Sequence, residues 1–371
     1  MAKLGEVCEV LDSKRVPITA ANRVSGQYPY YGANGVQDYV ADYIFDDELV
    51  LLAEDGGNFG SKEKPIAYRV SGKCWVNNHA HVLKPKAVID VDYLCYSLMF
   101  YDVSGLVNGA TRQKLTQSDM RKMEIPLRTM VEQKNIVCRL NKLTELISLR
   151  KQQLAKLDEL VKARFVEMFG DFEVNPKEFP VYHLCELCDV GSSKRIYQEE
   201  QSISGIPFLK VADLNELIDT GKYLCSTFIP LERYEQLLHK ELTPKENDIL
   251  ITSRGTLGKC YIVQSDDEFY FQDGMISWLS NLSTKVSSIY ISYLFAQPYI
   301  QKQIESLQAG STVAYLSIAM LKKMNVILPP KKLQDDFATF VEHVDQQKQT
   351  VQQSLEKLEL MKKALMQEYF G

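Results

Sequence analysis

The chain contains one long segment twice, and this internal repeat limits the possible folds more than any other feature of the sequence. Gly109 to Met123 (GATRQKLTQSDMRKM) matches Gly310 to Met324 (GSTVAYLSIAMLKKM) at a shift of 201 residues. The same shift continues without a gap to the last residue, and 16 of the 62 aligned residues are identical. A repeat at a fixed shift predicts that one structural element occurs twice in the fold.

Both copies contain a heptad pattern, with apolar residues at alternating spacings of four and three over residues 136–168 and 337–369. This is the pattern of a coiled-coil seam. Polar residues interrupt the two seams at different places, since Arg150 of the first copy aligns with Val351 of the second. We therefore predict two helices of about 38 residues, each roughly 57 Å long, that pack on each other as an antiparallel pair. The alternative, in which each helix packs only on its own globular domain, stays open.

A shorter repeat opens each half of the chain, because residues 4–15 (LGEVCEVLDSKR) match residues 184–195 (LCELCDVGSSKR) at a shift of 180. We interpret both as equivalent strand-and-turn segments at the start of a domain. The second copy contains Cys185 and Cys188 at a spacing that zinc sites use. Gly5 stands in place of the first cysteine in the other copy, which argues against a zinc site.

The stretches between the matched segments are unlike each other and differ in length by about twenty residues, since the shift changes from 180 to 201. The chain therefore alternates between variable and constant parts. The predicted boundaries are 1–108 for the first variable domain, 109–170 for the first helical segment, 171–309 for the second variable domain and 310–371 for the second helical segment.

The variable parts contain short apolar runs that end in glycine turns, at residues 47–56 and 246–255. Further strand-like runs follow at residues 74–83 and 269–279, and each is followed by a helix-like stretch. Such runs are typical of β-strands closed by turns. The predicted fold class is α+β, with two mixed α/β domains, a pair of long helices and an internal pseudo-twofold repeat.

The net charge of −5 is unevenly distributed. Residues 109–170 carry 13 basic against 7 acidic side chains, and residues 310–371 carry 8 against 7. Residues 1–108 carry 10 against 14, and residues 171–309 carry 12 against 20. This distribution excludes a protein that coats nucleic acid through general positive charge, but not one that reads bases through a narrow patch.

Eight scattered cysteines and an N-terminus without an apolar leader segment indicate a protein of the reducing cytoplasm. No run of residues is apolar enough to predict a membrane span.

The motifs of common enzymes are missing from the sequence. The glycine pairs at residues 57–60 and 255–258 lack the spacing and the Ser/Thr of a Walker A loop. His79 and His81 would lie on one face of a strand, but no third metal ligand stands nearby in the sequence. Neither a glycine-rich S-adenosylmethionine loop nor a methyltransferase motif with two prolines and an aromatic residue occurs. We predict a chain without catalytic residues, metal or cofactor of its own.

The order of these segments, and several of their sequences, resemble the specificity subunit of type I restriction–modification systems. The resemblance covers nearly the whole chain and rests on YPYYGANGVQDYV (28–40), WVNNHAHVLKP (75–85), GIPFLKVADL (205–214) and the two junction sequences that begin at Gly109 and Gly310. The first junction departs from the pattern, because it has Arg128-Thr129 where the second has two prolines.

The resemblance implies that each variable domain is a target recognition domain for one half of a bipartite, non-palindromic site in double-stranded DNA, and that the helices fix the distance between the halves. It implies two modification subunits as partners, which bind S-adenosylmethionine and methylate adenine. It also implies two optional restriction subunits, which use ATP and Mg²⁺. These cofactors would belong to the partners and not to this chain.

Candidate DNA-binding residues follow from residue type and position, because cations position a protein on phosphates and amides, arginines and carboxylates read base edges. The phosphate candidates are Lys14, Arg15, Lys194 and Arg195, although a solvated turn would explain them equally well. The base-reading candidates are Asn77, Asn78, His79, Lys210, Asp213, Arg254, Gln272 and Asp273. Similar candidates at the two junctions are Thr111, Arg112, Gln113, Lys114, Ser311 and Thr312.

Two alternatives remain open at this stage. One is a DNA-reading subunit whose partner combines methylation and cleavage in a single chain. The other is a coiled-coil scaffold that binds protein and not DNA, which the acidic second domain favours slightly. The genes next to this one would distinguish all three.

Overall fold

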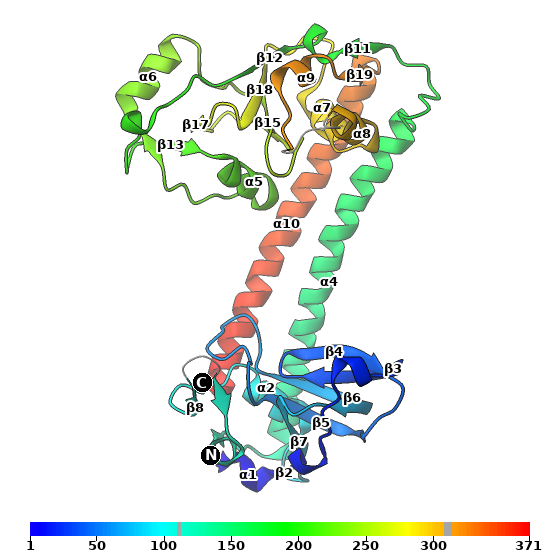
Figure 1. Ribbon diagram of the computed structural model, residues 1–371, viewed down its shortest axis with the longest axis vertical. Coiled ribbons are helices and arrows are strands. Elements are labelled where there is room, and N and C mark those ends of the chain that lie inside the picture. Colours follow the sequence, from blue (N-terminus) through cyan, green and yellow to red (C-terminus); the bar gives the residue numbers. More distant parts are fainter. Residues whose placement is uncertain (110–112, 308–313) are drawn as a thin grey trace. The chain divides into compact units, whose positions relative to one another are not determined.

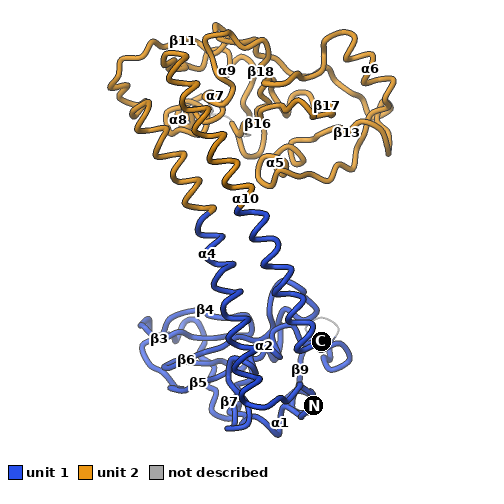
Figure 2. The backbone as a smooth tube through the Cα atoms, turned by 180° about the vertical axis from the view of Figure 1, so that it is seen from behind, with its two compact units in different colours: residues 1–153, 351–371 blue, residues 154–350 orange. Residues whose placement is uncertain are grey.

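The computed structural model describes residues 1–109, 113–307 and 314–371. Two compact units are present (Figure 2): unit 1 comprises residues 1–153 and 351–371, and unit 2 comprises residues 154–350. Each unit contains one α+β domain together with part of two long helices, α4 (Met130–Phe169) and α10 (Lys331–Phe370) (Figure 1).

The domain of unit 1 is built on a six-stranded sheet with the strand order β2-β7-β5-β6-β3-β4. All neighbouring strands are antiparallel except β3 and β6. The bounds are β2 (Cys8–Val10), β3 (Ser25–Gly32), β4 (Gly35–Val40), β5 (Phe45–Ala53), β6 (Ala67–Val76) and β7 (Ala80–Pro85). The remaining elements are β1 (Ala2–Lys3), α1 (Leu4–Val7), the 3-10 turns η1 (Asp12–Lys14) and η2 (Ala20–Asn22), α2 (Val91–Met99), β8 (Val107–Asn108), β9 (Lys114–Leu115), α3 (Gln117–Lys122) and β10 (Glu124–Ile125).

The central strand β5 is covered on both faces, which explains its continuous apolar run. Val50 and Leu52 pack in one hydrophobic cluster with α2, whereas Leu49 and Leu51 pack in a second cluster on the opposite face. Successive side chains of a strand point to opposite faces, so a strand covered on both sides needs no polar alternation.

The domain of unit 2 contains a four-stranded antiparallel sheet with the order β12-β18-β15-β16 and a three-stranded sheet with the order β14-β13-β17. The strands are β11 (Val181–His183), β12 (Asp189–Ser192), β13 (Ile206–Leu209), β14 (Phe228–Ile229), β15 (Ile249–Thr252), β16 (Cys260–Ile262), β17 (Tyr270–Phe271), β18 (Ile276–Ser280) and β19 (Asn325–Ile327). The helices and 3-10 turns are η3 (Leu184–Glu186), η4 (Gln198–Glu200), α5 (Val211–Thr220), α6 (Leu231–His239), α7 (Ser288–Phe295), α8 (Pro298–Leu307) and α9 (Ile318–Lys322).

The two domains share one four-stranded core. The order β2-β7-β5-β6 in unit 1 corresponds strand by strand to β12-β18-β15-β16 in unit 2. In chain order, unit 1 inserts β3 and β4 between the first and second core strands, β2 and β5, whereas unit 2 inserts β13, α5, β14 and α6 between β12 and β15. The longer insertion in unit 2 accounts for the difference in length between the two variable parts of the sequence.

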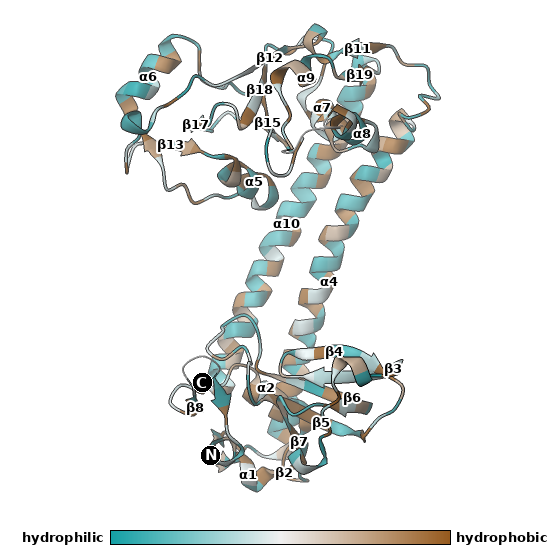
Figure 3. Ribbon diagram, in the orientation of Figure 1, coloured by the Kyte–Doolittle hydropathy of each residue, from teal (hydrophilic) through white to brown (hydrophobic). Residues whose placement is uncertain are grey.

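The long helices pair in an antiparallel direction within each unit. In unit 1, Arg150 Nε donates to Ser354 Oγ at 3.2 Å and Lys151 forms an ion pair with Glu359 at 2.9 Å. In unit 2, Lys348 pairs with Asp158 at 2.5 Å. Every heptad position predicted to form the seams is buried or half-buried, and apolar segments recur along both helices (Figure 3). The predicted fold class, with two α+β domains and two packed helices, is confirmed.

A buried glutamine fixes the start of each long helix to its domain. The side chain of Gln133 accepts from Asp90 N at 2.8 Å and donates to Val88 O and Arg128 O. Gln334, its equivalent in the repeat, accepts from Ser287 N at 2.9 Å and donates to two carbonyls in the same way. Both side chains are fully buried. We call each arrangement a glutamine clamp.

The beginning and the end of each domain lie side by side. In unit 1, β1 pairs with β10 and Leu4 N donates to Met123 O at 2.8 Å. In unit 2, β11 pairs with β19 and Leu184 N donates to Met324 O at 2.9 Å. The segment between Gly109 and α4, predicted to belong with the helix, therefore also completes the domain. The four domain boundaries given above remain a prediction.

Candidate nucleic-acid interface

Four segments of unit 1 meet at one edge of the shared sheet: residues 12–15, 54–56, 77–80 and 113–115. Glu54 N donates to His79 O at 2.9 Å, and Leu115 N donates to Glu54 O at 2.7 Å. An isolated β-bridge joins Asp55 to Lys114. We call this place the first junction edge. Several predicted site residues that are distant in sequence are neighbours here.

The outer side chains of the first junction edge are polar and accessible. Asn78 and Gln113 are exposed, and the Lys114 side chain is 51% exposed. His79 Nδ1 lies 2.6 Å from Asp55 Oδ1 and the imidazole remains one-third exposed. Amides, an imidazole and an ammonium group can all donate hydrogen bonds to base edges or phosphates.

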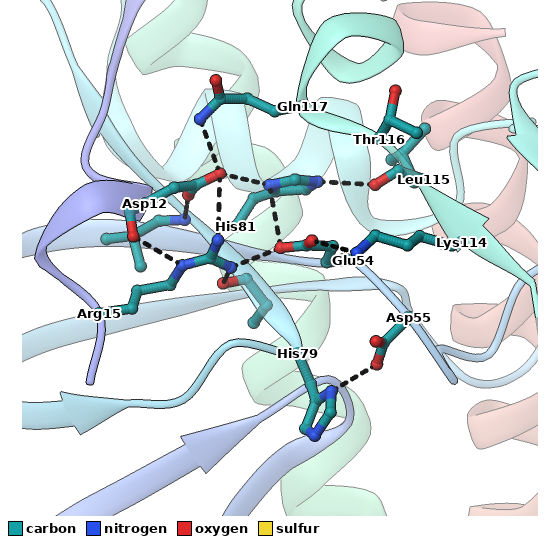
Figure 4. A network of polar contacts seen from close by, with 12 residues as sticks. Asp12, Arg15, Glu54, Asp55, His79, His81, Lys114, Leu115, Thr116 and Gln117 are labelled. Carbon is teal, nitrogen blue, oxygen red and sulfur yellow. Dashed lines mark hydrogen bonds and ion pairs between the residues drawn. The ribbon is translucent and has the colours of Figure 1, made fainter. Parts of the chain in front are cut away.

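A network of buried charged groups supports the first junction edge from inside (Figure 4). Arg15 Nη1 donates to Glu54 Oε2 at 2.6 Å and to Ala80 O at 2.7 Å. His81 Nδ1 lies 2.6 Å from Asp12 Oδ2, and Lys114 Nζ lies 3.0 Å from Glu54 Oε1. The network therefore connects η1, the end of β5, β7 and β9.

Both ring nitrogens of His81 face oxygen atoms of the chain. Nε2 lies 2.9 Å from Leu115 O, and Nδ1 lies 2.6 Å from the carboxylate of Asp12. Burial acts to raise the pKa of Asp12, but the hydrogen bonds from His81 and Val82 N and the electrostatic interactions with His81 and Arg15 outweigh it, so this pKa is lowered. The His81 ring is therefore held between η1 and β9.

Three of these side chains have the composition of a metal site. Ligand atoms of Asp12, Glu54 and His81 all lie within 4.8 Å of one another. Arg15 and Lys114 already bind the Glu54 carboxylate at 2.6 and 3.0 Å, and Arg15 forms a longer ion pair with Asp12 at 3.6 Å. The donor set is thus satisfied by groups of the chain itself and does not fit a metal ion.

The equivalent place in unit 2, the second junction edge, comprises residues 192–195, 253–255, 272–275 and 314–316. Leu316 N donates to Ser253 O at 3.0 Å, as Leu115 N does to Glu54 O in unit 1. Ser253 Oγ and Ser277 Oγ lie 2.7 Å apart in the buried position that Glu54 and His81 occupy in unit 1. The backbone frame is the same, but small hydroxyl groups replace the charged network.

The outer side chains of the second junction edge differ from those of the first. Arg254 is bridged to Tyr315, and its guanidinium carbon lies 5.3 Å from the centre of that ring. Arg195 Nε donates to Asp273 Oδ2 at 2.9 Å, and Lys194 is exposed. Guanidinium groups are the usual partners of guanine edges and of phosphates.

Two predicted site residues have internal roles. The Arg15 side chain is only 12% exposed and lies in the network described above. Asn77 is buried, and its side-chain amide donates to Gln37 Oε1 at 3.0 Å and accepts from His79 N at 2.8 Å. Lys14, in contrast, is exposed at the end of η1.

The remaining candidates fall into two groups. Gln272 N donates to Leu209 O, which places it next to Lys210. The carboxylate of Asp213 accepts from Lys210 N at 2.8 Å and caps α5. Thr111, Arg112, Ser311 and Thr312 lie outside the residues that the structure describes.

Sequence reasoning missed three residues at these edges: Asp55, Tyr315 and Gln117. Asp55 is the repeat equivalent of the selected Arg254, since each directly precedes the glycine of its turn. Tyr315 is likewise the equivalent of Lys114. Aligning the two halves residue by residue would have found both. Gln117, whose Nε2 donates to Asp12 Oδ2 at 3.0 Å across 105 residues, left no such pattern.

The cysteine pair of unit 2 is divided between two environments. Cys185 is exposed, whereas Cys188 is buried with its thiol directed at Leu184 O. Burial raises the pKa of the Cys188 thiol to about 12. A thiol that resists ionisation is a poor metal ligand and a poor nucleophile.

Two α+β domains with a common sheet core, each continuous with the same two long helices, define a class of two-domain proteins with internal pseudosymmetry. The family model of the type I restriction modification DNA specificity domain matches residues 1–159 and 176–360 of this chain. The chain belongs to this family of type I restriction–modification specificity subunits.

Individual relatives agree with this assignment. The Haemophilus influenzae protein S.HindORF215P, assigned as a type I restriction enzyme specificity subunit, is 32% identical over 338 residues, covering 89% of this chain and 83% of that protein. The MjaVIII specificity subunit of Methanocaldococcus jannaschii is 23% identical and covers 99% of this chain and 90% of its own.

Solved structures support the fold. The S subunit of a type I restriction–modification system from M. genitalium aligns with a TM-score of 0.61 at 16% identity, covering 100% of this chain and 95% of its own. A chain from a study of complex assembly in a type I system aligns with a TM-score of 0.58 and covers 100% of this chain and 96% of its own. Among the described residues, no helix is long and apolar enough to cross a membrane.

Proposed function

We propose that this specificity subunit reads a bipartite, non-palindromic sequence in double-stranded DNA, with unit 1 selecting one half-site and unit 2 the other. The first and second junction edges are the reading surfaces. Because reading is confined to these edges, the net negative charge of the chain is compatible with DNA binding.

One observation carries this proposal: the two junction edges have the same backbone frame and different outer side chains. Equivalent bridges join Asp55 to Lys114 in unit 1 and Arg254 to Tyr315 in unit 2. The first edge presents a carboxylate beside an imidazole, and the second presents a guanidinium group against a phenol ring. The two edges therefore offer different patterns of hydrogen-bond donors and acceptors. Since each base pair offers its own pattern in the major groove, the two half-sites should differ.

We further propose that the chain itself is not catalytic and acts in the cytoplasm with two modification subunits and, where present, two restriction subunits. S-adenosylmethionine, and ATP with Mg²⁺, would bind to those partners. The polar groups of the junction edges are suited to hydrogen bonding with DNA, and no S-adenosylmethionine motif occurs in the sequence. Purified alone, the chain should transfer no methyl group from labelled S-adenosylmethionine to DNA, and its modification subunit should restore transfer to adenine.

The bipartite assignment is tested by mapping methylated motifs genome-wide in cells that express the chain with its modification subunit. Replacing Asn78 and His79 by alanine should relax base selection in one half-site. Replacing Arg254 and Gln272 should relax only the other. Loss of a base contact costs about 1–3 kcal/mol of discrimination. If both double variants changed the same half-site, or neither changed any, the proposal would be wrong.

Phosphate contacts give a different result. Lys14→Ala should weaken binding to all sequences alike and reduce the dependence of affinity on salt, because a phosphate contact releases counterions without reading bases. Arg15→Ala should instead destabilise unit 1, because its side chain is internal. Binding across a salt series, together with thermal unfolding, separates the two.

A further inference from the structure

The charged network of unit 1 is directed at the segment that follows β8 and leads to the long helix. Three of its contacts reach residues 113–117. Glu54 binds Lys114 Nζ, His81 binds Leu115 O, and Asp12 binds the Gln117 amide at 3.0 Å. Two of these residues, Gln113 and Lys114, belong to the outer face of the first junction edge.

The same network residues also flank the other outer groups of this edge in sequence. Glu54 directly precedes Asp55, and its backbone N–H donates to His79 O. One residue separates His81 from His79, and the His81 ring is held by two hydrogen bonds, at 2.6 and 2.9 Å. The positions of Asp55, His79 and Lys114 are thus coupled through buried side chains that cannot themselves touch DNA.

Charged hydrogen bonds are short and directional, and inside a protein they resist rearrangement more than neutral ones do. The network sets two carboxylates, Asp12 and Glu54, against the cations of Arg15 and Lys114 and the imidazole of His81. Removing one member leaves the others with unmatched charge. Unit 2 holds the equivalent segment by a backbone bond to Ser253 and a serine pair, without buried charge.

We propose that Asp12, Glu54, His81 and Gln117 are positioning residues for base selection by unit 1, acting by fixing Gln113 and Lys114 beside Asn78 and His79. This inference rests on the proposed DNA-reading function and extends it to residues that act through the network. Gln117 is the accessible end of the network, because it is an exposed residue at the first turn of α3.

The test maps the methylated motif for Gln117→Ala in the complex with the modification subunit. Alanine removes only the bond to Asp12 from a surface position, so the chain should still fold. We expect discrimination in the half-site read by unit 1 to fall about tenfold, the size of one lost base contact, with the other half-site unchanged. Glu54→Gln should relax the same half-site by releasing Lys114.

Two controls separate positioning from simple destabilisation. Gln117→Lys retains a donor of similar length for Asp12 and should restore selection. Ser277→Ala disturbs the equivalent place in unit 2 and should leave the first half-site as it is. A loss of stability would lower methylation at all sites without changing the motif.

The inference is overturned if Gln117→Ala leaves the motif unchanged, if it relaxes both half-sites equally, or if the lysine variant does not restore selection. These outcomes are distinguishable from failure of the proposed function. If the proposed function were wrong, the Asn78 and His79 double variant would also leave the first half-site unchanged. If only the positioning inference were wrong, that double variant would still relax the first half-site.

Discussion

The interiors of the two junction edges differ much more than their backbones do. Unit 1 buries Glu54 and His81 within a network of five ionisable groups, and unit 2 buries Ser253 and Ser277 at the same place. Both versions keep the same strand order and equivalent bridges. The comparison teaches that the shared sheet core fixes the backbone of both junction edges. The side chains that stabilise each edge from inside differ, with ionisable groups in unit 1 and hydroxyl groups in unit 2.

The largest difference in lost stability between the two units should come from removing the His81 imidazole of unit 1. His81→Leu leaves the buried carboxylate of Asp12 without its closest partner, and we expect unit 1 to lose about 3–5 kcal/mol. Ser277→Ala removes one neutral hydrogen bond and should cost unit 2 only about 1 kcal/mol. Urea unfolding of the full chain can report each unit separately when the tryptophan of the other unit is replaced by phenylalanine, because Trp75 lies in unit 1 and Trp278 in unit 2. Equal losses would contradict the contrast between the two edges.

Removing the two glutamine clamps should cost the two units similar amounts of stability, because both clamps make the same hydrogen bonds. Gln133→Leu and Gln334→Leu each remove three hydrogen bonds from a fully buried side chain. We expect each change to cost about 3 kcal/mol in its own unit. The same tryptophan probes apply, and a clear inequality between the two clamps would show that they are not equivalent in energy.

Acid should distinguish the units through two buried aspartates. The pKa of Asp12 is lowered, so its stabilising contribution is present above its unfolded value of about 3.8 and is lost as the pH falls through the lower folded value. Burial raises the pKa of Asp248 in unit 2, more than the bonds from Lys245 N and Trp278 and the charge of Lys245 lower it. Its contribution is therefore present below the unfolded value and is lost as the pH rises through the folded value.

These opposite signs predict different results for two matched variants. Asp12→Asn should cost unit 1 about 2 kcal/mol at neutral pH, since hydrogen bonds to charged groups are lost, and should flatten its acid dependence. Asp248→Asn keeps an acceptor for Trp278 Nε1 and removes a buried charge, so unit 2 should lose no stability at neutral pH. Unfolding of both variants from neutral pH into acid, followed by each tryptophan, checks the signs.

The smallest effect concerns the helix pair. Lys362 in unit 1 is the repeat equivalent of Val161 in unit 2, which is buried in its seam. Burial lowers the pKa of Lys362, and the nearby charge of Lys151 adds to this. Lys362→Leu should therefore stabilise unit 1, by about 0.5–1 kcal/mol. An unchanged or lower denaturation midpoint would show that the ammonium group is well solvated in the seam.

The sequence predicted those parts of the molecule that depend on local patterns. The heptad seams of residues 136–168 and 337–369 were predictable because helical periodicity is visible within one segment. The shared strand order was not, because β12 and β18 meet across more than 80 residues in domains with little common sequence. Arg15 looked like a solvated turn residue beside Lys14, since its partner Glu54 lies 39 residues away.

The candidate site shows the same division. Asn78, Gln113 and Lys114, which were selected as DNA-binding candidates, are exposed residues of one edge, whereas Asn77, selected with them, is buried. Composition cannot tell two adjacent asparagines apart, because only the fold decides which of them faces Gln37. Whether the accessible residues contact bases remains a prediction.

The pairing of each domain's beginning with its end has a consequence for the gene. Because β1 closes on β10 and β11 closes on β19, every variable strand lies between two joints that are equivalent in both halves. A recombination event with crossovers at these joints would replace a whole domain and leave Gln133 and Gln334, which lie outside the joints, in place. Under the proposed function, the host would then methylate a new target sequence after one genetic step. No intermediate with a partly exchanged, misfolded domain would be needed.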